Sequence, residues 1–355
     1  MARDAGLNMP AHAKRFRPES AKLSGRLDWL DHRSSLLLDN PLGDPSDRQH
    51  PVYLPPGYDE TDQRYPVLLS LAAYTNAGPG QVAWRNHGES LPQRLDRLIE
   101  QGTLPPVIAV FPDCYTSLGG NQYVNSPAIG AYADYLVDEL LPLLDAKYRT
   151  LAQTQSRAVF GKSSGGFGAL HLVMKRPGIF AAAASHAGDC GFDRVYPRDF
   201  PATCDVLARY DNDLTAFVRA FWRKKRPGGA DFHAMMTLCL AASYSPAPDQ
   251  ALGCELPFDL ETCELKEAVW QRWLDFDPAR CASEYSDHLA DLAGLWIDAG
   301  NRDQYFIHYG TRQLHRTLSA AGIAHFFEEF DGTHSGIDWR YDHSLPWMVQ
   351  RLKLD

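Results

Sequence analysis

The sequence predicts a doubly wound α/β fold, in which helices cover both faces of a mostly parallel sheet, with a mainly helical cap inserted into it. Short apolar runs alternate with longer amphipathic stretches along most of the chain, as βα units require. Residues 192–288 break that alternation and are rich in aromatic residues. The 355 residues are 45% hydrophobic and 22% charged, a composition typical of globular proteins. The chain is therefore long enough for one large α/β unit or two smaller domains.

The predicted strands are short runs of apolar, often β-branched or aromatic residues. They lie at 35–38, 51–54, 65–71, 107–111, 157–160, 181–185, 295–297 and 325–330. Helices are predicted between them at 90–101, 130–147, 164–175 and 311–321. Strands and helices that alternate in this way form a parallel sheet that is buried on both faces.

The predicted domain organisation has four parts. Residues 1–20 are polar and basic and are expected to form a loose N-terminal arm. Residues 21–191 and 289–355 are the two parts of the α/β core, and residues 192–288 are the inserted cap. Most aromatic residues of the insertion are expected to pack the cap, and a few to wall a substrate pocket.

Charge and cysteine usage exclude several classes of function. The chain has 35 basic and 44 acidic residues, a net charge of −9, which disfavours nucleic-acid binding. No apolar run approaches about 18 residues and no signal sequence is apparent, so we expect a soluble, cytoplasmic protein without a membrane partner. The seven cysteines form no CxxC pair and are interpreted as reduced thiols.

The most informative motif is Gly-Lys-Ser-Ser-Gly, which begins at Gly161 and ends at Gly165. It follows a predicted strand and opens a predicted helix. A turn this sharp holds its central residue in a strained conformation and requires glycine where neighbouring backbone comes close. The motif predicts that Ser163 projects its hydroxyl from the carboxyl edge of the sheet, as a nucleophile. The alternative is a glycine-rich turn without chemistry.

A serine nucleophile needs a base and an acid later in the chain, in the order Ser, Asp or Glu, His. Asp303 follows the predicted strand 295–297, and His334 follows the predicted strand 325–330. Asp298 competes with Asp303 for the acid role, and His186 could also line the site. We favour Asp303, because it lies farther into its loop and can reach across to a histidine.

Stabilisation of a tetrahedral oxyanion requires two backbone N–H donors. The predicted donors are Ser164, at the start of its helix, and Tyr74, in the loop after the strand 65–71, with Ala73 as the alternative to Tyr74. The same loop contains Gly78, Gly80 and Ala83 in a G-x-G-x-x-A pattern, but no acidic residue ends a strand about 20 residues later. No metal-binding or phosphate-binding motif occurs, so neither a cofactor nor a metal is predicted.

These residues resemble the esterase D-like family of α/β-hydrolases, which includes S-formylglutathione hydrolases, feruloyl esterases, enterochelin-type esterases and mycolyltransferases. The resemblance covers residues 52–58, 65–69, 111–113, 161–166, 297–304 and 331–335. It implies an α/β-hydrolase fold, with Ser163, Asp303 and His334 as nucleophile, acid and base. Ser164 replaces an apolar residue common in the family, and the insertion exceeds the usual spacing, so the resemblance does not identify the substrate.

The predicted function is that of a serine esterase, which cleaves small carboxylic esters through an acyl-enzyme intermediate. Acyl transfer and thioester hydrolysis, as in S-formylglutathione hydrolases, are the alternative reactions. A non-catalytic binding protein with this fold is the alternative outside enzymes. The sequence leaves open whether the chain forms a homo-oligomer.

Overall fold

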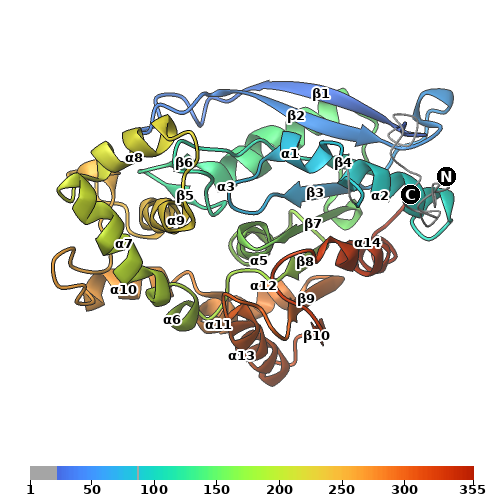
Figure 1. The fold of residues 1–355 in the computed structure, drawn as a ribbon. Coiled ribbons are helices and arrows are strands. Elements are labelled where there is room, and N and C mark those ends of the chain that lie inside the picture. The colour runs from blue at the N-terminus through green and yellow to red at the C-terminus, as the bar shows by residue number, and fades with distance from the viewer. Residues whose placement is uncertain (1–21, 86–87) are drawn as a thin grey trace, which may run out of the picture.

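The computed structural model describes residues 22–85 and 88–355, so the predicted arm at 1–20 lies outside the described residues. Within them, one large sheet has the strand order β1-β2-β4-β3-β7-β8-β9-β10 (Figure 1). Its strands are β1 (Arg26–Arg33), β2 (Asp47–Leu54), β3 (Val67–Leu71), β4 (Ile108–Val110), β7 (Arg157–Lys162), β8 (Ala182–His186), β9 (Gly294–Gly300) and β10 (Phe326–Phe330). A small separate hairpin pairs β5 (Asn125–Ser126) with β6 (Gly130–Ala131).

Most of the sheet is parallel, which confirms the predicted fold class. The six neighbouring strands β4, β3, β7, β8, β9 and β10 pair in parallel, whereas β2 pairs antiparallel with both β1 and β4. The predicted strand at 35–38 is wrong, because these residues form a turn. The first strand instead lies at Arg26–Arg33, where it pairs along its length with β2. It forms the polar edge of the sheet and so lacks the apolar run used to find strands.

Both faces of the sheet are buried, as the alternation of side chains along β3 illustrates. Leu69 belongs to one hydrophobic cluster and Leu68 to another on the opposite face. The Leu68 cluster includes side chains of α2 (Leu91–Glu100) and α14 (Tyr341–Val349). The Leu69 cluster includes those of α4 (Leu141–Lys147), α5 (Ser164–Lys175) and α13 (Ile307–Ala320).

The helix predicted at 164–175 coincides with α5, and the one predicted at 90–101 with α2 and its N-cap Ser90. The capping box between Ser90 and Gln93 fixes that start. The stretch predicted at 130–147 is divided into α3 (Tyr132–Asp134), a π-helical segment over Tyr135–Leu140 and α4. This half also contains the short helix α1 (Gly78–Val82).

The segment between β8 and β9 is mainly helical, as expected. It contains α6 (Phe192–Val195), α7 (Phe200–Leu207), α8 (Leu214–Arg223), α9 (Gly229–Tyr244), α10 (Glu267–Leu274), α11 (Pro278–Cys281) and α12 (Ser286–Ala290). Helices α7, α8, α9 and α10 gather on the side of the molecule away from α2 and α14 (Figure 1). Buried aromatic side chains such as Phe217 and Trp273 join the cluster on the Leu69 face of the sheet. That this segment acts as a cap, with boundaries at 192 and 288, stays a prediction.

Candidate active site

The turn between β7 and α5 holds Ser163 in a strained backbone conformation, with φ 57° and ψ −125°. Such a positive φ is uncommon for any residue except glycine. A Cβ atom on Gly165 would lie 2.1 Å from the carbonyl oxygen of Leu71, and one on Gly161 would lie 2.5 Å from the backbone of Gly165. Glycine is therefore required on both sides of the serine, since β3 and the start of α5 are in close contact.

The loops after β9 and β10 bring Asp303 and His334 together. The Nδ1 atom of His334 lies 2.8 Å from Oδ2 of Asp303. The other carboxylate oxygen accepts the backbone N–H of Tyr305 at 2.8 Å. Two backbone hydrogen bonds join these segments. The N–H of Asn301 donates to the carbonyl of Phe330, and the N–H of residue 302 donates to the carbonyl of residue 332, both at 2.9 Å.

Neighbouring side chains fix the orientation of the imidazole. The Oε1 atom of Gln304 accepts the backbone N–H of His334 at 2.9 Å, and the Tyr305 ring meets the imidazole edge-on with centroids 4.8 Å apart. Asp303 and His334 are 2% and 8% exposed, whereas Ser163 is half-buried. Only the serine of this set is therefore readily reached from outside.

The competing residues Asp298 and His186 pair with each other and not with His334. Asp298 lies within β9, opposite His186 of β8, and the two side chains are 2.8 Å apart. The second ring nitrogen of His186 lies 2.9 Å from Ser344 Oγ, and Arg340 Nε donates to Asp298 at 2.8 Å. Ser344, His186 and Asp298 thus form a second serine–histidine–aspartate row, but all three are fully buried.

The two predicted oxyanion donors lie on elements that meet at the serine. The backbone N–H groups of Ser164 and Tyr74 make no hydrogen bond with the described residues. Two tyrosine hydroxyls help to hold the loop that carries Tyr74: Tyr74 Oη donates to Leu118 O at 2.9 Å, and Tyr123 Oη donates to Ala72 O at 2.6 Å. Ala73, the alternative donor, lines the same cavity as Tyr74.

A cavity of about 350 Å³ opens beside Ser163 and is called the Ser163 cavity here. It is lined by Ala73, Tyr74, Thr75, Lys162, Ser163, Asp189, Val195, Tyr196, Phe232, His233, Met236, Tyr305, Ile307 and His334. The set combines the nucleophile and base candidates with apolar side chains from the segment after β8. A serine and a histidine that share a largely apolar cavity can carry out acyl chemistry on a small substrate.

The motif search missed two charged residues that line this cavity, Lys162 and Asp189. The ammonium of Lys162 makes no hydrogen bond or ion pair with the described residues, and burial lowers its pKa. Asp189 follows β8 by three residues, at the sheet edge where Ser163 stands. Its place just after a strand was the signal that could have found it.

Within residues 22–85 and 88–355, no group of three or more His, Cys, Asp or Glu side chains could hold a metal ion.

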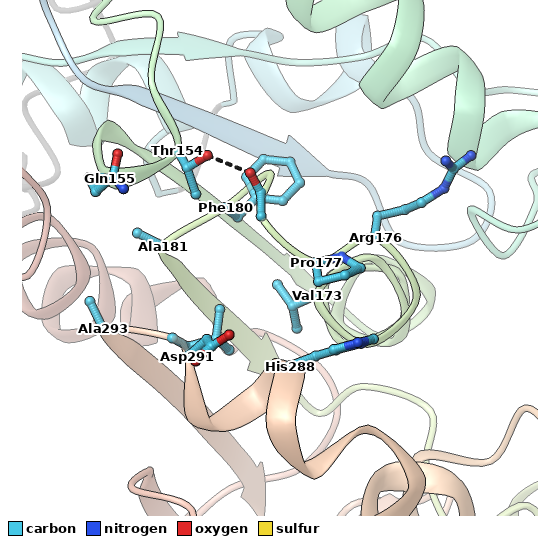
Figure 2. Close-up of a pocket in the computed structure, with 12 residues that line it drawn as sticks. Thr154, Gln155, Val173, Arg176, Pro177, Phe180, Ala181, His288, Asp291 and Ala293 are labelled. Carbon is cyan, nitrogen blue, oxygen red and sulfur yellow. Dashed lines mark hydrogen bonds between the residues drawn. The ribbon is translucent and has the colours of Figure 1, made fainter.

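A second pocket, of about 270 Å³, lies at the opposite edge of the sheet (Figure 2). Thr154, Ala181 and Ala293 line it, and they precede β7, β8 and β9 respectively. Thr154 Oγ1 donates to the Gly178 carbonyl beside it. None of the predicted site residues lines this pocket, whereas Ser163, Tyr74 and His334 line the Ser163 cavity. No described helix is long and apolar enough to cross a membrane.

The parallel sheet, the strained serine between β7 and α5 and the loops after β9 and β10 define an α/β-hydrolase fold. The family described as "Putative esterase" matches residues 45–352, and the chain belongs to this family. The resemblance recognised in the sequence is therefore confirmed.

Individual relatives and solved structures agree with this assignment. The chain is 37% identical over 256 residues to Esterase Rv1288 of Mycobacterium tuberculosis, an alignment that spans 70% of this chain but only 46% of that protein. It is 29% identical over 133 residues to an endo-1,4-beta-xylanase/feruloyl esterase of Xylanibacter ruminicola, covering 36% of this chain and 18% of that protein. The chain thus spans about half, or less, of the length of these relatives.

Two solved structures share the fold over nearly their whole length. A ferulic acid esterase matches with a TM-score of 0.60 at 18% identity, covering 92% of this chain and 98% of that one. An S-formylglutathione hydrolase from Agrobacterium tumefaciens matches with a TM-score of 0.55 at 17% identity, covering 94% of this chain and 97% of that one.

Proposed function

We propose that this protein is a serine esterase that hydrolyses carboxylic esters through Ser163, His334 and Asp303. The observation that carries the proposal is the 2.8 Å contact between His334 and Asp303, in loops that end at the cavity of a strained serine. Membership of the putative esterase family and a relative named as an esterase support the reaction class.

In the first half of the reaction, His334 Nε2 removes the Ser163 proton as the hydroxyl attacks the ester carbonyl. Asp303 accepts the Nδ1–H of His334, which keeps Nε2 free to act as the base and stabilises the imidazolium that forms. His334 then gives the proton to the departing alcohol. In the second half, water attacks the acyl-enzyme with the same base, and Ser163 is released with the acid product.

The tetrahedral intermediates of both halves carry a negative oxygen. The backbone N–H groups of Ser164 and Tyr74 are proposed to donate to it. Two observations support this: neither group is used in a hydrogen bond with the described residues, and Ser164 begins α5, whose N-terminus favours negative charge. A donor pair of this kind contributes about 10²- to 10³-fold to turnover for each donor.

Hydrolysis of p-nitrophenyl acetate by the full chain tests the proposal. Ser163→Ala removes the nucleophile and should lower kcat on the order of 10⁶-fold, toward the uncatalysed rate. The control is Ser319→Ala, on the exposed face of α13, which should keep the wild-type rate. Activity that survives Ser163→Ala would show that another group performs the chemistry. A folded wild type without esterase activity would favour acyl transfer, thioester hydrolysis or a binding role.

A further inference from the structure

Asp189 is a buried carboxylate in the wall of the Ser163 cavity, and the proposed triad does not use it. It is 6% exposed. Both of its hydrogen bonds reach the same oxygen: Oδ2 accepts Tyr196 Oη at 2.9 Å and Gln122 Nε2 at 3.5 Å. The other oxygen, Oδ1, accepts no hydrogen bond from the described residues. This oxygen is not sealed off from solvent, and Asp189 lines the Ser163 cavity.

A carboxylate in this position lacks the cation that usually accompanies buried acids. Among the described residues no lysine, arginine or histidine lies within ion-pair distance of Asp189, although the charge of a protonated His334 lowers its pKa. Burial, the largest influence, raises the pKa of Asp189 to about 6. The fold therefore retains a costly unpaired acid at the edge of the cavity, which is common where a side chain binds a ligand.

The surroundings of Asp189 connect it to the proposed oxyanion site. Gln122 is fully buried, and its Nε2 atom lies 3.3 Å from Ser164 Oγ and 3.5 Å from Asp189 Oδ2. Its Oε1 atom accepts no hydrogen bond within the described part of the chain. Ser164 supplies one of the proposed oxyanion donors. A substrate group that meets Oδ1 of Asp189 is therefore close to the reacting ester, since both line one cavity of about 350 Å³.

The chemistry of the cavity favours a neutral hydrogen-bond donor over a cation as the partner of Oδ1. Lys162 lines the same cavity and forms no ion pair with the described residues, so the wall already carries a positive side chain besides Asp189. Val195, Met236 and Ile307 make much of the remaining wall apolar. A hydroxyl group can pair with Asp189 there without bringing a second charge that must be stripped of water.

We propose that Asp189 is a substrate-binding residue whose Oδ1 atom accepts a hydrogen bond from a hydroxyl group close to the scissile ester. The site thereby selects hydroxylated esters over the same esters without the hydroxyl. This inference rests on the proposed esterase function. The hydroxyl can belong to the acyl chain or to the alcohol, because both lie within a few bonds of the carbonyl.

Two matched pairs of esters distinguish these sources. Ethyl 3-hydroxybutanoate against ethyl butanoate places the hydroxyl on the acyl chain, and 2-hydroxyethyl butanoate against propyl butanoate places it on the alcohol. Titration of the released acid in a pH-stat gives kcat/KM for each ester. The wild type should prefer the hydroxylated member of one pair by about tenfold to a hundredfold, as hydrogen bonds to charged groups provide.

Asp189→Ala should bring that preference to about one, because kcat/KM for the hydroxylated ester falls by about tenfold to a hundredfold more than kcat/KM for its unhydroxylated partner. Asp189→Asn keeps the size of the side chain and should lower the preference through loss of the charge. This variant provides the test if the alanine variant does not fold. Asp193→Asn, at an exposed acid paired with Arg280, should leave the preference unchanged. A general loss of structure would lower both members of a pair together and leave their ratio alone.

Equal rates for both members of each pair in the wild type, or a preference that persists in both Asp189 variants, would overturn the inference. Neither result affects the esterase proposal. The absence of hydrolysis dependent on Ser163 for the unhydroxylated butanoates would instead overturn the proposed function itself.

Discussion

Two aspartates near the end of β9 have different roles because they differ in register. Asp298 belongs to the strand and faces His186 across the sheet, whereas Asp303 lies beyond its end and reaches His334. Burial alone would raise the pKa of Asp298, yet His186 and the Arg340 guanidinium hold it below its ordinary value. The order of residues in the sequence favoured Asp303 as the catalytic acid. That Asp298 pairs with His186 follows only from the register of β8 against β9.

Asp303→Asn is expected to lower kcat for p-nitrophenyl acetate by about 10⁴-fold, because the amide no longer holds the imidazole in its productive tautomer. The change removes one charge and keeps the shape of the side chain, so the melting temperature should change little. Steady-state kinetics together with a thermal melt check both expectations.

Asp298→Asn is the matched comparison. It leaves the buried His186 without its acid and the buried Arg340 with only Glu328, and loss of a buried partner of this kind destabilises a fold by about 3–5 kcal/mol. We expect a lower melting temperature, with turnover largely kept in the folded fraction. The reverse pattern, with chemistry lost in Asp298→Asn and kept in Asp303→Asn, would contradict the assignment of the acid.

At the scale of elements, the contact between β3 and α5 builds the site. It positions Ser163 and, through the backbone after Leu71, the loop that carries Tyr74. The Gly-x-Ser-x-Gly pattern predicted this turn and the helix after it, since glycine spacing and apolar periodicity are local properties. The strand at Arg26–Arg33 was missed because an edge strand exposes polar side chains and its pairing with β2 is not a local property.

Gly165→Ala is expected to impair both folding and catalysis. Its Cβ would lie 2.1 Å from Leu71 O and 2.9 Å from Ala72 O, both backbone atoms, so β3 and α5 must separate. The expected result is a fall in kcat of at least tenfold and a destabilisation of about 1–3 kcal/mol, as for overpacked sites. Urea denaturation and esterase kinetics measure the two effects.

Gly178→Ala provides the control for backbone strain. Gly178 follows α5 with φ +78° and has open space around its Cβ position. Its replacement should cost about 1 kcal/mol of stability and leave kcat unchanged. Equal kinetic effects at both glycines would mean that close packing at the serine is not what positions it.

The whole molecule is expected to lose stability in acid, because several histidines are buried in a neutral form. Burial lowers the pKa of His171 to about 3 and that of His50 to about 3. Below the ordinary value of 6.5 the unfolded chain binds protons that the folded chain does not, so stability falls as pH drops from 6.5 toward 3. Asp189, with its pKa raised to about 6, acts in the opposite sense and loses stabilisation as pH rises through 6.

Substituting His171 isolates one of these contributions. His171 stacks between Phe167 and Phe276 on the buried side of α5, and leucine fits an apolar environment. Between pH 6.5 and pH 5, His171→Leu should lose about 2 kcal/mol less stability than the wild type. Urea denaturation at the two pH values measures this difference. Parallel losses in the two proteins would show that His171 does not titrate across this range.

At the scale of the whole molecule, local sequence patterns predict some parts of the candidate site and not others. The order of serine, aspartate and histidine predicted Ser163, Asp303 and His334, because their loops follow recognisable strands, and the last two are in contact in the structure. The cavity wall depends on how the segment after β8 packs against the sheet, as with Tyr196 and Met236. That packing joins residues far apart in the chain, and no local pattern encodes it.

The most direct test of the central claim is covalent labelling of the folded wild type with a fluorophosphonate, followed by peptide mass spectrometry. We predict one adduct on Ser163, with labelling slowed at least 10²-fold in His334→Ala, because the imidazole activates the hydroxyl. A folded wild type in which Ser163 stays unmodified would contradict the account, as would an adduct on Ser344 of the buried second row.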